Sequence, residues 1–83
     1  MKRLVISEHA RFEMQRRAIS EQAVRQVAVS PQQVVSSRKG REVRQSQWED
    51  PKQGRTVLLR VVVQEREGEI FVVTAYKTSK IQK

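Results

Sequence analysis

A chain of 83 residues has room for one hydrophobic core, so we expect a single domain that spans residues 1–83. It contains no cysteine and no apolar run of membrane-spanning length, which argues against disulfides, thiolate metal sites and a membrane span and predicts a cytoplasmic protein without a cofactor. Its 17 lysines and arginines against 9 acidic residues give a formal net charge of +8, so polyanions are the expected partners, nucleic acid before an acidic protein.

The first third of the chain predicts two helices. Residues 2–6 are either a short edge strand or the lead-in to a helix, because three consecutive apolar residues fix neither period. Ser7 can cap a helix that runs as far as Ala18. Ser20 can cap a second helix that ends near Val29, before Ser30-Pro31. The inner stripe of that second helix would be Ala23, Val24, Val27 and Ala28.

From residue 32 the pattern changes to short segments typical of strands. We expect strands at residues 32–37 and 41–48 across a Lys39-Gly40 turn, then a long hairpin after the polar loop 49–54. Residues 78–83 would form a short basic tail. The order predicts an α+β fold, in which two N-terminal helices pack on one face of a three- to four-stranded antiparallel meander sheet.

The hairpin organises this predicted fold. It contains two β-branched runs, residues 57–63 and 70–74, which are separated by a charged segment ending in Gly68. A three-residue loop at 66–68 would place Glu65 opposite Glu69 and so fix the register of the two strands. The side chains buried under the helices would then be Val57, Leu59, Val61, Phe71, Val73 and Ala75.

The opposite face of the hairpin is mixed in character. The same register places Arg60 across from Thr74 and diagonal to Tyr76, so that a cation, a hydroxyl and a phenol converge in the middle of the sheet. These groups are either part of a functional site or ordinary surface residues, an arginine extending from a half-buried surface and an edge aromatic.

The residues capable of chemistry favour reactions that need no metal. His9, Glu13, Arg16 and Arg17 fall within an arc of about 100° on the first helix, where Glu13 could orient the imidazole or merely pair with the arginines. Asp50 is the only aspartate and the glutamates lack ligand spacing, so we expect no metal site. Histidine, tyrosine, lysine and arginine suit RNA cleavage, in which a base takes the 2′-OH proton, cations stabilise the phosphorane and an acid protonates the leaving oxygen.

Two parts of the sequence resemble a known family. They are His9-Ala10, Met14 and residues 17–20 in the first helical region, followed by residues 59–63 and 72–80 in the hairpin. Together these segments resemble the small bacterial family known as domain of unknown function 4258, over nearly the whole chain. That family is generally placed with the RelE/ParE-like toxins and the barnase-like ribonucleases, which implies a helical pair against a twisted antiparallel sheet. Ala18 stands where the family often has Gly, Glu13 where it often has Arg, and Gln64 where an acid is common.

The resemblance also implies a function and the residues that perform it. The implied activity is that of a metal-free, RNA-cleaving toxin of a bacterial toxin–antitoxin system, with RNA, free or on the ribosome, and an acidic antitoxin as partners. Two alternatives remain: a non-catalytic basic module that binds nucleic acid, and an interaction domain for an acidic protein. The implied catalytic residues are His9, Arg17, Arg60 and Tyr76, and the expected nucleic-acid contacts are Arg16, Lys77, Thr78 and Lys80.

Overall fold

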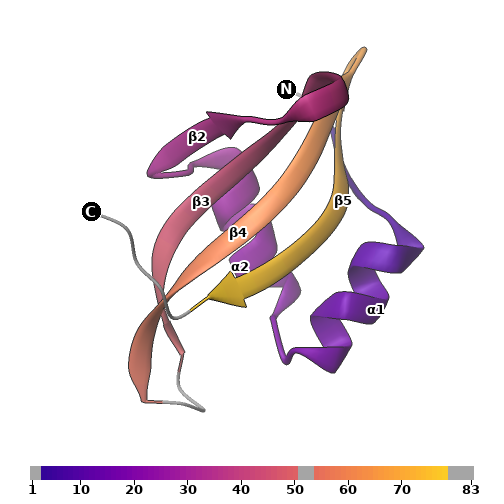
Figure 1. Ribbon diagram of the computed structural model, residues 1–83. Coiled ribbons are helices and arrows are strands. Elements are labelled where there is room, and N and C mark those ends of the chain that lie inside the picture. The colour runs from indigo at the N-terminus through magenta and orange to yellow at the C-terminus, as the bar shows by residue number, and fades with distance from the viewer. Residues whose placement is uncertain (1–2, 51–53, 79–83) are drawn as a thin grey trace.

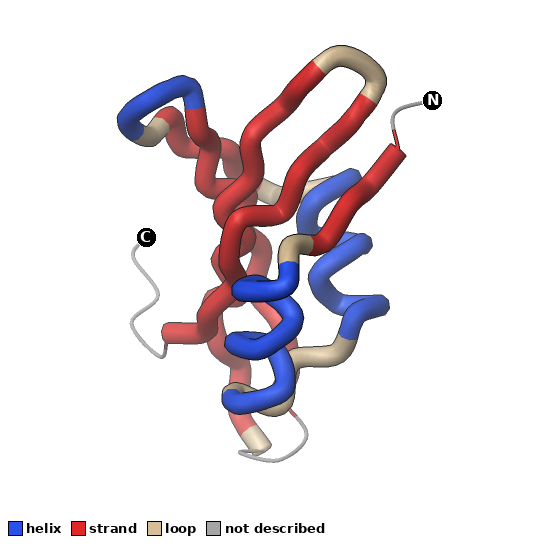
Figure 2. The backbone as a smooth tube through the Cα atoms, turned by 90° about the vertical axis from the view of Figure 1, so that its right-hand side faces the viewer, coloured by secondary structure: helices blue, strands red, loops and turns tan. Residues whose placement is uncertain are grey.

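The computed structural model describes residues 3–50 and 54–78. In chain order the elements are β1 (Arg3–Ile6), α1 (Glu8–Arg16), α2 (Glu21–Val29), β2 (Gln33–Ser36), the short 3₁₀ turn η1 (Arg38–Gly40), β3 (Arg41–Asp50), β4 (Arg55–Arg66) and β5 (Glu69–Thr78). The strands form one sheet in the order β1-β5-β4-β3-β2. Figure 1 shows α2 behind the sheet and α1 beside β5, and Figure 2 shows that both helices lie on the same side of it.

The α+β class and the two N-terminal helices are confirmed, but the sheet differs from the predicted antiparallel meander of three or four strands. It has five strands and is mixed, because β1 pairs in parallel with the first half of β5 while every other pair is antiparallel. The segment left open as strand or lead-in is therefore a strand. It covers an edge of β5 that would otherwise expose unpaired backbone groups.

Serines cap both helices, as predicted. The Ser7 hydroxyl accepts a hydrogen bond from the Ala10 N–H at 3.0 Å, and the Ser20 hydroxyl accepts one from the Ala23 N–H at 3.1 Å. Between the helices Ala18 has a left-handed backbone, with φ at 56°, and this residue turns the chain from α1 into α2. Over residues 3–50 and 54–78, neither helix has the length and apolar character needed to cross a membrane.

The hydrophobic core lies between the helices and the sheet. The predicted inner stripe of α2 is buried there, and it packs against the inward-facing side chains of β4 and β5. The burial of this stripe is what holds α2 on the sheet, since isolated helices of this length are marginal in water. The core consists of Ile6, Ala10, Met14, Ile19, Ala23, Val24, Val27, Ala28, Leu59, Val61, Val63, Ile70, Val72 and Ala75.

The register of the hairpin is not the predicted one. Its turn has two residues, Glu67-Gly68, so Arg66 pairs with Glu69 and the side chains that follow face opposite to the expected direction. The prediction was therefore wrong for two side chains on β5, because Phe71 and Val73 are only half-buried. Ile70 and Val72 take their places in the core.

A β-bulge then returns the following side chains of β5 to the sheet faces that were predicted for them. Val62 pairs with Thr74 and Val63 with Val72, which leaves Val73 as the extra residue on β5. Beyond it Ala75 is buried as predicted.

The bulge lies where the edge of β5 stops pairing with β1 and begins to lie beside α1. β1 ends at Ile6, opposite Val72. The Ser7 N–H donates to the Val72 carbonyl at 3.1 Å, and the Ser7 hydroxyl donates to the Val73 carbonyl at the same distance. The N-cap of α1 therefore holds the carbonyls at the bulge, and α1 continues beside the second half of β5.

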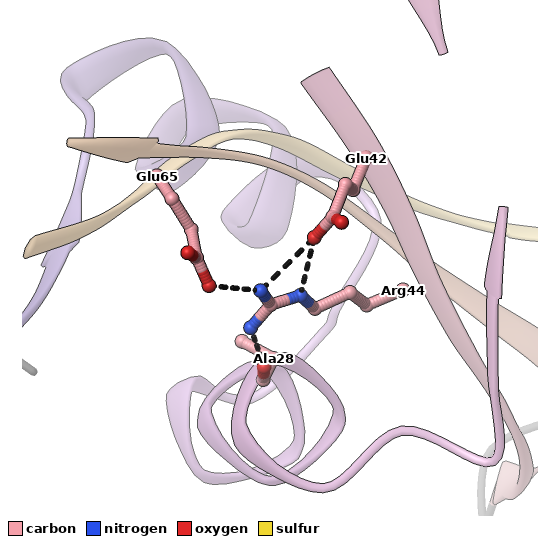
Figure 3. A network of polar contacts seen from close by, with 4 residues as sticks. All are labelled: Ala28, Glu42, Arg44 and Glu65. Atoms are coloured by element: carbon pink, nitrogen blue, oxygen red, sulfur yellow. Dashed lines mark hydrogen bonds and ion pairs between the residues drawn. The ribbon is translucent and has the colours of Figure 1, made fainter. Parts of the chain in front are cut away.

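One arginine fastens α2 to the sheet. Arg44 on β3 donates from Nη1 to the Ala28 carbonyl at 2.6 Å, and from Nη2 to the carboxylates of Glu42 at 3.0 Å and Glu65 at 2.6 Å (Figure 3). Ala28 lies in the last turn of α2, where carbonyls have no partner within the helix. The planar guanidinium thus joins a helix end to two strands.

Candidate nucleic-acid interface

The open face of the sheet, which the helices do not cover, carries a cation and a phenol in contact. Gln45, Arg60 and Tyr76 form one row across β3, β4 and β5. Arg60 Nε donates to Gln45 Oε1 at 3.0 Å, and the guanidinium carbon of Arg60 lies 5.4 Å from the centre of the Tyr76 ring. Within residues 3–50 and 54–78, neither terminal nitrogen of Arg60 has a hydrogen-bond partner. Both side chains lie on the open face, as predicted, but directly opposite each other rather than diagonally.

A second cation–aromatic pair lies on the same face, closer to the hairpin turn. The guanidinium carbon of Arg66 is 5.0 Å from the centre of the Phe71 ring. Phe71 belongs to a row that also contains Gln64 and Arg41. This pair was not predicted, because the expected hairpin register placed Phe71 in the core. The available signal was Gly68, since glycine readily adopts the positive φ, here 70°, that a tight turn can require at its second central residue.

The polar residues of α1 form the expected cluster around Glu13. Arg17 Nε donates to Glu13 Oε2 at 3.0 Å, and Arg16 Nη1 lies 3.9 Å from Glu13 Oε1. The hydrogen bond from Arg17, with the positive charge of Arg16, lowers the pKa of Glu13 below its ordinary value. Glu13 therefore pairs with the arginines. His9 is exposed, and no side chain among the described residues holds its imidazole by a hydrogen bond.

The predicted catalytic residues fall into two separate groups. His9 and Arg17 belong to the helical layer, whereas Arg60 and Tyr76 lie on the open sheet face. In the part of the chain that the structure describes, no hydrogen bond or ion pair joins a residue of one group to a residue of the other. Arg60 and Tyr76 are the two that contact each other.

The predicted contacts near the end of β5 also differ in position. Lys77 pairs with Leu59 on the helix side of the sheet, and its Nζ lies 2.7 Å from Oδ2 of Asp50, whose side chain is only 5% exposed. This ion pair lines a cavity of about 150 Å³ between the α1–α2 turn and the end of the sheet. Thr78 pairs with Leu58 and so faces the open side. Lys80 lies outside the described residues.

Arginines are paired with glutamates on the helices, whereas cations on the sheet side are left without ion pairs to described residues. Four helical-layer arginines pair with Glu13 or Glu21: Arg11, Arg16, Arg17 and Arg25. The hydrogen bond from Arg11, joined by one from Arg25, holds the pKa of Glu21 below its ordinary value. Five cations on or beside the open face have no ion pair with any described residue: Arg38, Lys39, Arg41, Arg60 and Arg66. Such cations can neutralise phosphates of a polyanion without first breaking an internal ion pair.

Comparison with known proteins identifies one family. A family model described as a domain of unknown function (DUF4258) matches residues 6–77, which is most of the chain. The matched segment extends from the end of β1 to the penultimate residue of β5, and it includes both helices and the open face. No curated protein and no solved structure matches the chain significantly. Among the described residues there is also no group of three or more histidine, aspartate or glutamate side chains placed to hold a metal ion.

Proposed function

The chain belongs to the DUF4258 family, and from its open sheet face we propose that it is a toxin-like ribonuclease that binds and cleaves RNA without a metal ion. The contact between Arg60 and Tyr76 on an unneutralised, positively charged face supports this proposal most directly. The resemblance of the family to RelE/ParE-like toxins and barnase-like ribonucleases supports the same reaction by analogy of fold.

Arg60 has the geometry needed to bind a phosphate. Its Nε donates a hydrogen bond to Gln45, and its guanidinium lies over the ring of Tyr76. These two contacts hold the guanidinium in place before any ligand binds. The two terminal nitrogens can then donate to two phosphate oxygens at once. During cleavage the phosphorus gains negative charge as the 2′-oxygen attacks it, and a fixed arginine stabilises that charge without reorganising.

Cleavage also requires two proton transfers. A base removes the proton of the 2′-OH as its oxygen attacks phosphorus, and an acid protonates the departing 5′-oxygen, which leaves a 2′,3′-cyclic phosphate. Tyr76 is paired with Arg60 across the two strands. Its hydroxyl is therefore the first proton carrier to be tested at the proposed phosphate site. His9, exposed on α1, is the second carrier to be tested.

A non-catalytic module that binds nucleic acid is the second candidate function. One observation favours it: among the described residues, Arg60 contacts a single proton carrier, Tyr76, and no acid–base pair is assembled around it. Binding alone needs only the unneutralised cations and the aromatic surface. An acidic protein such as an antitoxin would use the same cations, in which case RNA would compete with it for this face.

Three substitutions separate cleavage from binding. Arg60→Lys keeps the charge but loses the planar fork, so cleavage should fall about 10- to 1000-fold while RNA affinity changes little. Tyr76→Phe or His9→Gln should lower cleavage about 100- to 10,000-fold if that residue transfers a proton. The measurement is RNA cleavage, with EDTA present, by purified protein acting on free RNA and on translating ribosomes. Arg25→Lys, a helical arginine already paired with Glu21, is the matched control and should cleave like the wild type.

Each outcome of this experiment discriminates between the candidates. RNA binding without cleavage by any variant, including the wild type, would favour the binding module. Cleavage that requires added Mg²⁺ would show that the metal-free mechanism is wrong. Cleavage that survives all three substitutions would place the active site elsewhere on the molecule.

A further inference from the structure

We infer that the open face contains a second RNA-binding position, formed by Arg66 and Phe71, at which an unpaired base stacks, and that its ligand is therefore a single strand of RNA lying along the β4–β5 hairpin. This inference rests on the proposed function, since it concerns the same face. It adds the class of substrate, a single strand several nucleotides long, and two residues that bind it.

The two cation–aromatic pairs are built alike. In each, an arginine on β4 lies over an aromatic ring on β5, with 5.4 Å between guanidinium carbon and ring centre for Arg60–Tyr76 and 5.0 Å for Arg66–Phe71. Both rings are half-buried on the open face. An unpaired base can stack on such a ring or on the guanidinium plane that covers it.

The distance between the pairs sets the length of the ligand. The row that contains Phe71 is four residues along β4 from the row that contains Tyr76, so the two rings are about 14 Å apart at about 3.4 Å per residue. A stacked nucleic-acid strand advances about 3.4 Å per nucleotide, so this separation equals about four steps, and fewer for an extended strand. A dinucleotide can occupy one position only, whereas six nucleotides can reach both.

The surface between and beside the pairs suits a single strand. The intervening row contains Val62 and Thr74, which are half-buried and offer apolar contact to riboses and bases, whereas Val43 in the same row is buried. Arg41, in the row of Phe71, has no carboxylate partner among the described residues and can bind a phosphate beside the second position. Paired bases in a duplex have their faces covered by their neighbours, so a duplex gains nothing from either ring.

Phe71→Leu tests the second position because it keeps an apolar side chain and removes the aromatic face. The affinity for labelled single-stranded RNA should rise in the wild type as the oligonucleotide lengthens from two to six nucleotides. In the variant this rise should be reduced, with affinity for the hexanucleotide at least about fivefold weaker. Arg66→Gln, which removes the cation and leaves Phe71 in place, should weaken the same length-dependent binding.

Two controls isolate the effect. Phe12→Leu makes the same chemical change on α1, where the side chain is 61% exposed, and should bind RNA of every length like the wild type. A duplex RNA of the same length should bind the wild type and Phe71→Leu equally. Thermal melting of each variant confirms that the fold is retained.

Failure of this inference can be distinguished from failure of the proposed function. If Arg60→Ala weakens binding of single-stranded RNA but Phe71→Leu and Arg66→Gln do not, the second position is wrong and the proposed function stands. If neither Arg60→Ala nor Phe71→Leu weakens binding, the open face is not the RNA site and both proposals are wrong, as expected if the face binds an acidic protein instead.

Discussion

Arg44 and Arg41 lie three residues apart on β3, yet the fold uses them in different ways. Arg44 is 9% exposed, and its guanidinium donates to a helix carbonyl and forms ion pairs with two glutamates. Arg41 is exposed on the open face, with no ion pair to any described residue. The formal charge of the sequence does not distinguish a structural arginine from one available to a ligand. The burial of the side chain and its ion-pair partners make that distinction.

Replacement of these two arginines should therefore have opposite effects. Arg44→Met removes the donor that binds a buried carbonyl, Glu42 and Glu65, and we expect the free energy of unfolding to fall by about 2–3 kcal/mol. Arg41→Met should change it by less than about 0.5 kcal/mol but should weaken RNA binding. Urea denaturation and RNA binding of both variants measure this. Equal stability of the two variants would contradict the structural role of Arg44.

At the scale of elements, the turn between α1 and α2 contains a strained residue. Ala18 has φ at 56°, a conformation that costs an L-residue with a Cβ about 1–2 kcal/mol. Glycine adopts this conformation readily. The chain thus forms its helical pair at a cost in backbone strain that glycine at this position would avoid.

Ala18→Gly should stabilise the protein. The relief of backbone strain is partly offset by the greater entropy of glycine in the unfolded chain, about 0.4–1 kcal/mol, so we expect a net gain of about 0.5–1 kcal/mol in the free energy of unfolding. Gln26→Gly, at an exposed position in the middle of α2, should instead lower stability by a similar amount. Thermal and urea unfolding of the two variants test the prediction. Destabilisation by Ala18→Gly would show that strain at Ala18 is negligible.

The helices could be predicted from sequence because their signals are local. Ser7 and Ser20 cap them, and the apolar stripe of α2 needs no information from the rest of the chain. The hairpin register is different. It depends on one residue of loop length and on a bulge at Val73, where Ser7 binds the backbone of β5. A sequence pattern within the hairpin contains no sign of that distant contact.

The candidate site was predictable to the same extent. The placement of Arg60 and Tyr76 on one face was correct because the loop error and the bulge cancel beyond residue 73. Between the turn and the bulge only the loop error acts, so residues there face opposite to the prediction, and Phe71 was wrongly assigned to the core. Helical spacing grouped Glu13 with Arg16 and Arg17 correctly, but it cannot tell on which layer of the fold that group will lie.

On the scale of the whole molecule, the net charge is distributed unequally between the two layers. Arginines of the helical layer are paired with glutamates, whereas five cations on or beside the open face are not. The positive potential should therefore be strongest over the sheet. A polyanion approaching the molecule would be drawn to that face first.

This asymmetry predicts a steep and local dependence of RNA binding on salt. If three to five phosphates are neutralised, affinity for single-stranded RNA should fall about 20- to 100-fold between 50 and 200 mM salt. The double variant Arg38→Gln with Lys39→Gln should reduce the slope of log K against log salt by about 1.4. Arg25→Gln, on the helical layer, should leave the slope unchanged. Binding that is undetectable at low salt, or insensitive to salt, would contradict a polyanion partner.

The parallel pairing of β1 with β5 has a consequence for the order in which the protein forms. The contact between Ser7 and Val73 joins residues 66 positions apart. Contacts so distant in sequence slow folding, because the loop between them must close before they can form. During synthesis the helices emerge first, and the surface that holds Tyr76 opposite Arg60 cannot exist until β5 has been translated. A ligand that needs Arg60 and Tyr76 together therefore cannot bind the newborn chain until β5 has paired with β4.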